Sequence, residues 1–152
     1  MKIPKTIEDL KQLIADEVEE SINLDYKAAG ALQKTDGKKK EIAKDVSAMA
    51  NSAGGIIIYG IKEFDEASNK HLPESISAVQ RTEISKEWLE RVIQTNISPK
   101  IDGLLIYPVP LEKEDEVVYV VEIPQGTTAH QNTKDHRYYR RHNFESVPML
   151  DY

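Results

Sequence analysis

The sequence predicts an α+β fold in which a mixed β-sheet of about five to six strands is flanked by three helices. Apolar residues recur at helical spacing in three segments, and runs that suit β-strands lie between and after them. A glycine pair joins the second helical segment to the most apolar of these runs. No internal repeat, low-complexity tract or linker interrupts the 152 residues, so we expect a single domain over 1–152.

Two helices and a strand are predicted in the first third of the chain. Thr6, with Asp9 three positions later, gives a helix start of the capping-box type, and this helix is expected to end near Asp16. Its apolar face comprises Ile7, Leu10, Ile14 and Val18. Side chains alternate between polar and apolar over 22–28, which predicts a half-buried strand. A second helix, expected to end near Asn51, has the apolar face Ile42, Val46, Met49 and Ala50.

The most apolar run of the chain predicts a central strand. Residues 56–61 are almost all β-branched or aromatic, as expected of a strand that is buried on both faces. Gly54 and Gly55 directly before it provide the permissive backbone of a helix end and a tight turn. The order of helix, glycine turn and strand therefore predicts a crossover unit.

The second half of the chain predicts one more helix and three more strands. The polar stretch 63–82 is expected to be a loop. Ser85 caps the third helix, and residues 96–99 end it. The apolar stripe of this helix comprises Trp88, Leu89, Val92 and Ile93. The strands are expected at 104–109 and 117–123, which form a hairpin around 113–115, and at 136–142.

The composition excludes several classes of site. The chain has no cysteine, which rules out disulfides, thiolate zinc sites and a cysteine nucleophile. The N-terminus is charged where a signal peptide would be apolar, so a cytoplasmic protein without a membrane segment is expected. The net charge of −6 means that any contact with a polyanion must come from a local basic patch.

Basic residues gather in two segments. Between 126 and 143 there are four basic residues and one acid, and a second group comprises Lys34, Lys38, Lys39 and Lys40. On the expected last strand, one face would carry Arg137, Tyr139 and Arg141, and the other Tyr138 and Arg140. Such a surface can bind phosphates and stack on bases. Alternatively, one tyrosine face packs into the core and the arginines pair with the many acids of the chain.

Acidic residues at the first predicted strand form the other candidate site. Glu20 precedes it, and Asp25 and Lys27 would point to the same side of it. A polar strand edge that only maintains solubility has the same composition. The glycines before the central strand follow a helix, and Gly37 is followed by lysines without Ser or Thr, so neither is a nucleotide-binding loop. Hydrolysis of ATP is therefore not expected.

Taken together, the motifs resemble the Schlafen AlbA-like DNA-binding domain family, formerly called the divergent AAA domain. Glu20 with Leu24-Asp25-Tyr26-Lys27 resembles the opening glutamate and the Leu-Glu-Phe-Lys signature of that family. Residues 48–55 and Gly60-Ile61 resemble its Ala-Phe-Ala-Asn-Thr-x-Gly-Gly and Ile-Gly-Val segments. Its Val-Pro, Pro-His and Tyr-x-Arg elements correspond to Ile123-Pro124, Ala129-His130 and Tyr138-Tyr139-Arg140. The resemblance covers 17–149.

The resemblance implies a nucleic-acid-binding role, and some Schlafen relatives are metal-dependent ribonucleases with three carboxylates. Carried over by motif, these would be Glu20, Asp25 and Glu63, holding Mg²⁺ or Mn²⁺. The chain departs from the pattern, with Asp25 in place of glutamate, Glu63 in place of aspartate and Ala129 in place of proline. The chain is compatible with a free-standing protein or with part of a longer transcriptional regulator or defence protein.

Three functions follow as hypotheses. The first is binding of DNA or RNA, with phosphate or base contacts from Lys27, Lys38, Lys39, Arg137, Tyr138, Tyr139, Arg140 and Arg141. The second is a Mg²⁺- or Mn²⁺-dependent endoribonuclease that uses Glu20, Asp25 and Glu63. The third is a protein-interaction or oligomerisation domain, such as a homodimer, that pairs through an exposed strand edge.

Overall fold

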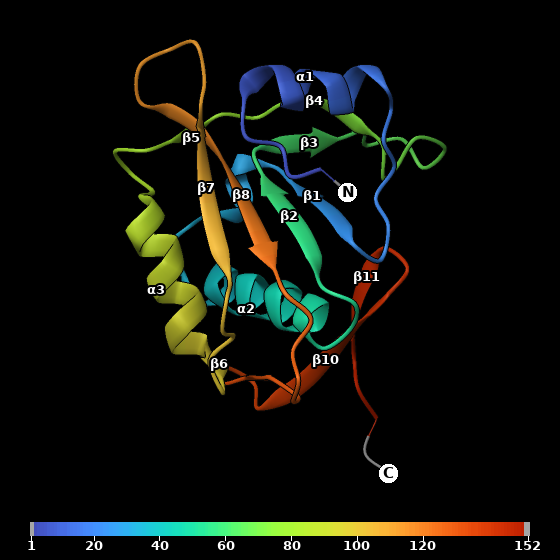
Figure 1. Cartoon of the computed structure of the whole chain (residues 1–152), viewed down its shortest axis with the longest axis vertical. Coiled ribbons are helices and arrows are strands. Elements are labelled where there is room, and N and C mark those ends of the chain that lie inside the picture. Colours follow the sequence, from blue (N-terminus) through green and yellow to red (C-terminus); the bar gives the residue numbers. More distant parts are fainter. Residues whose placement is uncertain (1, 151–152) are drawn as a thin grey trace.

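The computed structural model describes residues 2–150 and contains a five-stranded sheet at its centre (Figure 1). Its strands are β1 (Leu24–Lys27), β2 (Gly55–Tyr59), β5 (Val79–Gln80), β7 (Leu105–Pro110) and β8 (Glu116–Ile123). Strand β1 pairs with β2 in parallel, and β8 pairs antiparallel with β2, β5 and β7. The parallel pair with the helix between its strands is the predicted crossover unit, and the β7–β8 hairpin is also confirmed.

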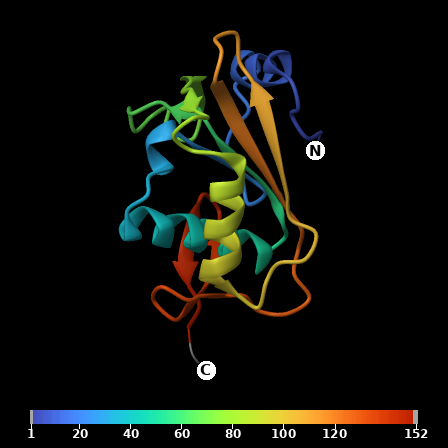
Figure 2. The ribbon, with the colours of Figure 1, turned by 90° about the vertical axis from the view of Figure 1, so that its left-hand side faces the viewer.

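Helices cover both faces of this sheet (Figures 1 and 2). Helices α2 (Asp36–Ala50) and α3 (Lys86–Asn96) pack on one face. Helix α1 (Ile7–Ala15) packs on the other face, together with a ribbon of β3 (Ile61–Glu63) and β4 (Pro73–Ile76). A short 3₁₀ helix at Ala29–Ala31 follows β1. The predicted α+β class and its three helices are confirmed.

Strand β2 is buried on both sides, as its composition predicts. Ile57 and Tyr59 belong to the core beneath α2 and α3, whereas Ile56 and Ile58 belong to the core beneath α1. All four side chains are at most 2% exposed. The period-two alternation of a strand thus supplies two hydrophobic cores from one apolar run.

The first and third helices begin after their predicted caps, Thr6 and Ser85, and the structure adds Thr35 as the cap of the second helix. The hydroxyl oxygens of Thr6, Thr35 and Ser85 accept hydrogen bonds from the backbone N–H groups three residues later, at 3.2, 3.3 and 3.1 Å. These bonds satisfy amides that have no partner within the helix. Helix α2 ends at Ala50, and Asn51 is its C-cap.

The glycine turn before β2 permits a close approach of two chain segments. Gly54 has φ +71°, a conformation that L side chains rarely adopt. A Cβ atom on Gly55 would lie 2.2 Å from the carbonyl oxygen of Asn23, so only glycine fits there. The turn therefore places the start of β1 directly beside the start of β2, which matters because β1 carries Asp25.

Two regions differ from the sequence expectation. The expected loop 63–82 contains β4 and β5, which are short and rich in polar residues and therefore lack a clear strand pattern. A further strand, β11 (Glu145–Pro148), pairs with β10 (Arg137–His142). Together with β6 (Ile97–Ser98) and β9 (Gln131–Asn132), they form a separate four-stranded sheet. Within residues 2–150, no helix is long and apolar enough to span a membrane.

Candidate nucleic-acid and metal site

Asp25 and Arg141 form a buried ion pair that joins β1 to β10. Atom Nη1 of Arg141 lies 3.1 Å from Oδ2 of Asp25, and the two residues are 3% and 1% exposed. Atom Nη2 donates to the carbonyl oxygens of Ser21 and Leu24, each at 3.2 Å. Burial opposes ionisation of Asp25, but its hydrogen bond with Glu20 and the charges of Lys27 and Arg141 lower its pKa.

Lys27 bridges two buried carboxylates. Its Nζ lies 3.5 Å from Oδ2 of Asp25 and 3.5 Å from Oδ2 of Asp45. Burial disfavours the charge of Lys27, but Asp45 and Asp25 outweigh it and raise the pKa, so the amine stays protonated. Asp45 also accepts a hydrogen bond from the Ser146 hydroxyl at 2.8 Å. Asp45 was not among the predicted site residues, although an acid between the buried Ile42 and Val46 of α2 was a detectable signal.

Glu20 lies at the edge of this cluster and is itself buried. Its Oε2 accepts a hydrogen bond from the Tyr26 amide at 2.8 Å, and its Oε1 lies 2.7 Å from Nδ1 of His71. Burial, followed by the adjacent Asp25 carboxylate, raises the pKa of Glu20 to about 10. The Glu20 carboxyl group is therefore protonated at neutral pH, which reduces the negative charge of the cluster.

His71 completes a group of metal-ligand atoms with Glu20 and Glu63. One ligand atom from each of the three residues lies within 4.8 Å of the others. The His71 amide donates to Oε2 of Glu63 at 2.9 Å, and its ring stacks on Phe144 with centroids 4.0 Å apart. The backbone of His71 has φ +78°, which is uncommon for a non-glycine residue. The ring is thus held in place from several sides.

The predicted three-carboxylate set is only partly gathered in one place. Glu20 and Glu63 share the cluster with His71, whereas Asp25 contacts Glu20 but is neutralised by Arg141 and Lys27. Two carboxylates and an imidazole suit Mn²⁺ or Zn²⁺ better than Mg²⁺, which prefers oxygen ligands. The sequence spacing gave no reason to select His71, because the chain from Glu63 to His71 returns to the site through a loop.

The basic and aromatic residues of β10 divide between two faces. Tyr139 and Arg141 are 5% and 3% exposed and point inward, and the Tyr139 hydroxyl donates to Asp135. Tyr138 is 41% exposed, and Arg140 is exposed beside it on the outer face. The predicted contacts of Tyr139 with a base and of Arg141 with a phosphate do not fit this burial, because both side chains already have internal partners.

The two basic segments of the sequence lie next to each other in space. Helix α2 packs along β9 and β10, and the Asn132 side chain donates to the carbonyl oxygen of Lys40 at 3.1 Å. Lys134 Nζ lies 3.3 Å from Asp36 of α2, and Lys40 Nζ lies 4.0 Å from Asp135. The first turns of α2, which carry Lys38 and Lys39, are therefore close to the β9–β10 turn, although about a hundred residues separate the two segments along the chain.

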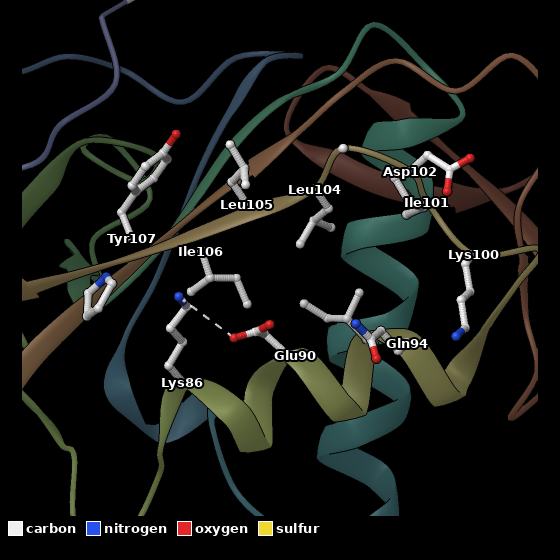
Figure 3. Close-up of a pocket in the computed structure, with 13 residues that line it drawn as sticks. Lys86, Glu90, Gln94, Lys100, Ile101, Asp102, Leu104, Leu105, Ile106 and Tyr107 are labelled. Atoms are coloured by element: carbon white, nitrogen blue, oxygen red, sulfur yellow. Dashed lines mark ion pairs between the residues drawn. The ribbon is translucent and has the colours of Figure 1, made fainter.

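A further pocket of about 550 Å³ lies between α3 and β7 (Figure 3). Lys86 and Glu90 form an ion pair of 3.9 Å at its wall, and no predicted site residue lines it. Strand β7 is an edge strand of the central sheet and pairs only with β8 among the described strands. Pro108 and Pro110 have no N–H to donate, so this edge is poorly suited to the strand pairing of the third hypothesis.

Comparison with known proteins identifies a family. Residues 8–150 match the family model described as Schlafen, AlbA_2. A comparison with curated proteins gave no significant match. Among solved structures, the chain is similar to the DIP2311 protein from Corynebacterium diphtheriae, with a TM-score of 0.55 and 16% sequence identity. That likeness, which concerns the fold, covers 92% of this chain and 29% of the other.

Proposed function

The chain belongs to the Schlafen AlbA_2 family, and from this premise we propose that it binds nucleic acid through the outer face of β10 and the lysines in the first turns of α2. Phosphates are contacted by Arg140 on the outer face, by Arg137 at the exposed start of the strand, and by Lys38 and Lys39. Tyr138 stacks on a base. Lys27 contributes from the rim of the buried cluster. A local surface of this kind is required because the net charge of −6 repels a polyanion elsewhere.

The observation that carries this proposal is the side-by-side exposure of Tyr138 and Arg140. Within residues 2–150, Arg140 makes no ion pair, and the Tyr138 ring is available for stacking. An aromatic ring beside a cation recognises an unpaired base and its phosphate without sequence preference. The arrangement therefore favours single-stranded RNA or DNA over a duplex.

The proposal is tested by fluorescence anisotropy with a labelled single-stranded RNA and its DNA counterpart at several salt concentrations. We expect log affinity to fall linearly with log salt, with a slope of about −0.7 for each phosphate contacted. Arg140→Gln should weaken binding and make the slope shallower by roughly one contact, whereas Lys113→Gln in the β7–β8 turn should not. Absence of binding to either nucleic acid at low salt would contradict the proposal.

A second function, metal-dependent cleavage of RNA, is favoured by the Glu20, Glu63 and His71 cluster. A divalent metal ion held there would polarise a phosphate oxygen and lower the pKa of a bound water. Glu20 and Glu63 would supply carboxylate ligands, and His71 a nitrogen ligand. Lys27 lies beside Asp25 and Glu20 and would place a positive charge next to the same phosphate.

Incubation of tRNA and single-stranded RNA with Mn²⁺, or with EDTA, tests this second function. We expect cleavage with Mn²⁺ and its loss in Glu63→Gln, because the neutral amide is a weaker metal ligand. Glu63 is preferable to Asp25 as a test position, since Asp25 is part of a buried ion pair and its removal would disturb folding. Cleavage that persists in EDTA, or in Glu63→Gln with Mn²⁺, would argue against a metal mechanism at this cluster.

A further inference from the structure

We propose that Lys27, Lys38 and Tyr59 form a subsite for one phosphate group of the bound nucleic acid, a proposal that rests on the proposed function. The subsite is a pocket of about 160 Å³ between β1, β2 and the first half of α2. These three residues line it together with Glu41, Asp45 and two apolar side chains. Its size suits a single phosphate.

The Tyr59 hydroxyl is the observation that points to a ligand. Tyr59 is 1% exposed, and its hydroxyl is buried without a hydrogen-bond partner within residues 2–150. A buried donor without an acceptor destabilises the folded protein, so such groups are rare and call for an explanation. Burial, and then the charges of Asp45 and Asp25, raise the pKa of Tyr59, which keeps the hydroxyl protonated and able to donate. A phosphate oxygen in the pocket would be its acceptor.

Two lysines give the pocket its positive charge. Lys27 has a side chain that is 32% exposed, and its Nζ stands 3.5 Å from each of two carboxylates. An ammonium group has three N–H donors, so one remains available to the pocket. Lys38 is half-buried at the pocket wall and has no ion pair within the described chain. The phosphate would thus accept from two ammonium groups and one phenol.

The acids of the pocket do not cancel this charge. Asp45 is paired with Lys27 and accepts a hydrogen bond from the Ser146 hydroxyl, so its carboxylate already has partners inside the protein. Glu41 is exposed at the rim and forms an ion pair with Lys44. The groups that remain unpaired in the pocket are therefore donors.

The position of the pocket gives the subsite a role. Lys27 contacts both Asp45 in the pocket wall and Asp25, which hydrogen-bonds to Glu20 of the candidate metal cluster. A phosphate bound by Lys27 would be connected to that cluster through two side chains, Lys27 and Asp25. Lys38 links the pocket to the α2 lysines on the other side. The subsite therefore fixes one backbone phosphate between the outer binding surface and the carboxylates.

Tyr59→Phe isolates the hydroxyl because it removes one oxygen atom and leaves the ring. We expect the affinity for a short oligouridylate to fall about tenfold, the effect of losing a hydrogen bond to a charged group. The melting temperature without nucleic acid should stay the same or rise, because an unpartnered donor has been removed. Tyr119→Phe is the matched control: its buried hydroxyl donates to the Ile84 carbonyl at 2.6 Å, so it should lose stability and keep affinity.

Inorganic phosphate separates failure of the subsite from failure of the proposed function. In NMR titrations, phosphate should shift the amide signals around Lys27, Lys38 and Tyr59 in the natural protein and not in Tyr59→Phe. If this result appears without binding of the oligonucleotide, the subsite stands and the nucleic-acid proposal fails. Unchanged oligonucleotide affinity in Tyr59→Phe, a lower melting temperature of that variant, or the absence of phosphate-induced shifts would each overturn the subsite.

Discussion

The guanidinium of Arg141 contacts the carboxylate of Asp25 at 3.1 Å, although 116 residues separate the two positions in the sequence. The contact joins the first strand of the central sheet to the strand whose outer face carries Tyr138 and Arg140. Because alternate residues of β10 point to opposite sides, Arg141 anchors this strand while Arg140 remains available to a ligand. Of these two neighbouring arginines, Arg141 thus stabilises the fold and Arg140 is available for binding.

Arg141→Ala should strongly destabilise the protein, whereas Arg140→Ala should not. Removal of Arg141 leaves the buried Asp25 without its nearest charge partner, and breaking a buried ion pair typically costs about 3–5 kcal/mol. Arg140 is exposed, so its removal should change the free energy of unfolding by about 0.5 kcal/mol or less. Urea denaturation followed by circular dichroism measures both values. Equal losses of stability in the two variants would show that the buried ion pair stabilises the protein no more than an exposed arginine does.

The stability of the protein should fall as the pH rises from about 5 to about 10. Glu20 has its pKa raised from 4.5 to about 10, first by burial and then by Asp25. In this range Glu20 keeps its proton in the folded protein and releases it in the unfolded chain. The contribution of Glu20 to the free energy of unfolding is therefore fully present below pH 4.5 and is lost as the pH rises through about 10. Glu20→Gln cannot release this proton and should show a flatter pH dependence in thermal unfolding. Parallel curves for both proteins would contradict the assignment.

Local patterns predicted the elements of this fold better than they predicted its sites. Apolar spacing located the three helices, with hydroxyl caps at the first and third, and the apolar run before Gly60 located β2. Strands β4 and β11 escaped prediction because four polar or mixed residues show no clear period. These failures affected the site directly, since the segment between β3 and β4 carries His71.

Tertiary packing decides which side chains of the site are buried, and a sequence motif does not predict this packing. The same alternation placed Tyr138 with Arg140 and Tyr139 with Arg141, but only packing against α2 decides which pair faces solvent. Asp25 was predicted as a site residue from its motif. Its neutralisation by Arg141 depends on a contact between opposite ends of the chain.

Mn²⁺ should raise the melting temperature of the protein by binding to Glu20, Glu63 and His71. A ligand that binds only the folded state stabilises it by about 2.7 kcal/mol at a hundredfold excess over its dissociation constant. The shift should disappear in Glu63→Gln and in His71→Gln, and persist in Asp65→Asn, whose carboxylate is 91% exposed outside the cluster. Because Glu20 must lose its proton to bind a metal ion, the affinity should also increase with pH. An equal shift of the melting temperature in all variants would show that Mn²⁺ binds outside this cluster.

The contribution of stacking can be separated from that of charge at Tyr138. Its ring is 41% exposed on the outer face of β10, so Tyr138→Ala should weaken binding of single-stranded RNA by about 1–3 kcal/mol without a comparable loss of stability. Tyr138→Phe keeps the ring and should bind nearly as well as the natural protein. Since neither substitution removes a cation, the slope of log affinity against log salt should stay the same in both, in contrast to Arg140→Gln. Isothermal titration at two salt concentrations distinguishes the two effects, and an alanine variant with unchanged affinity would exclude Tyr138 from the binding surface.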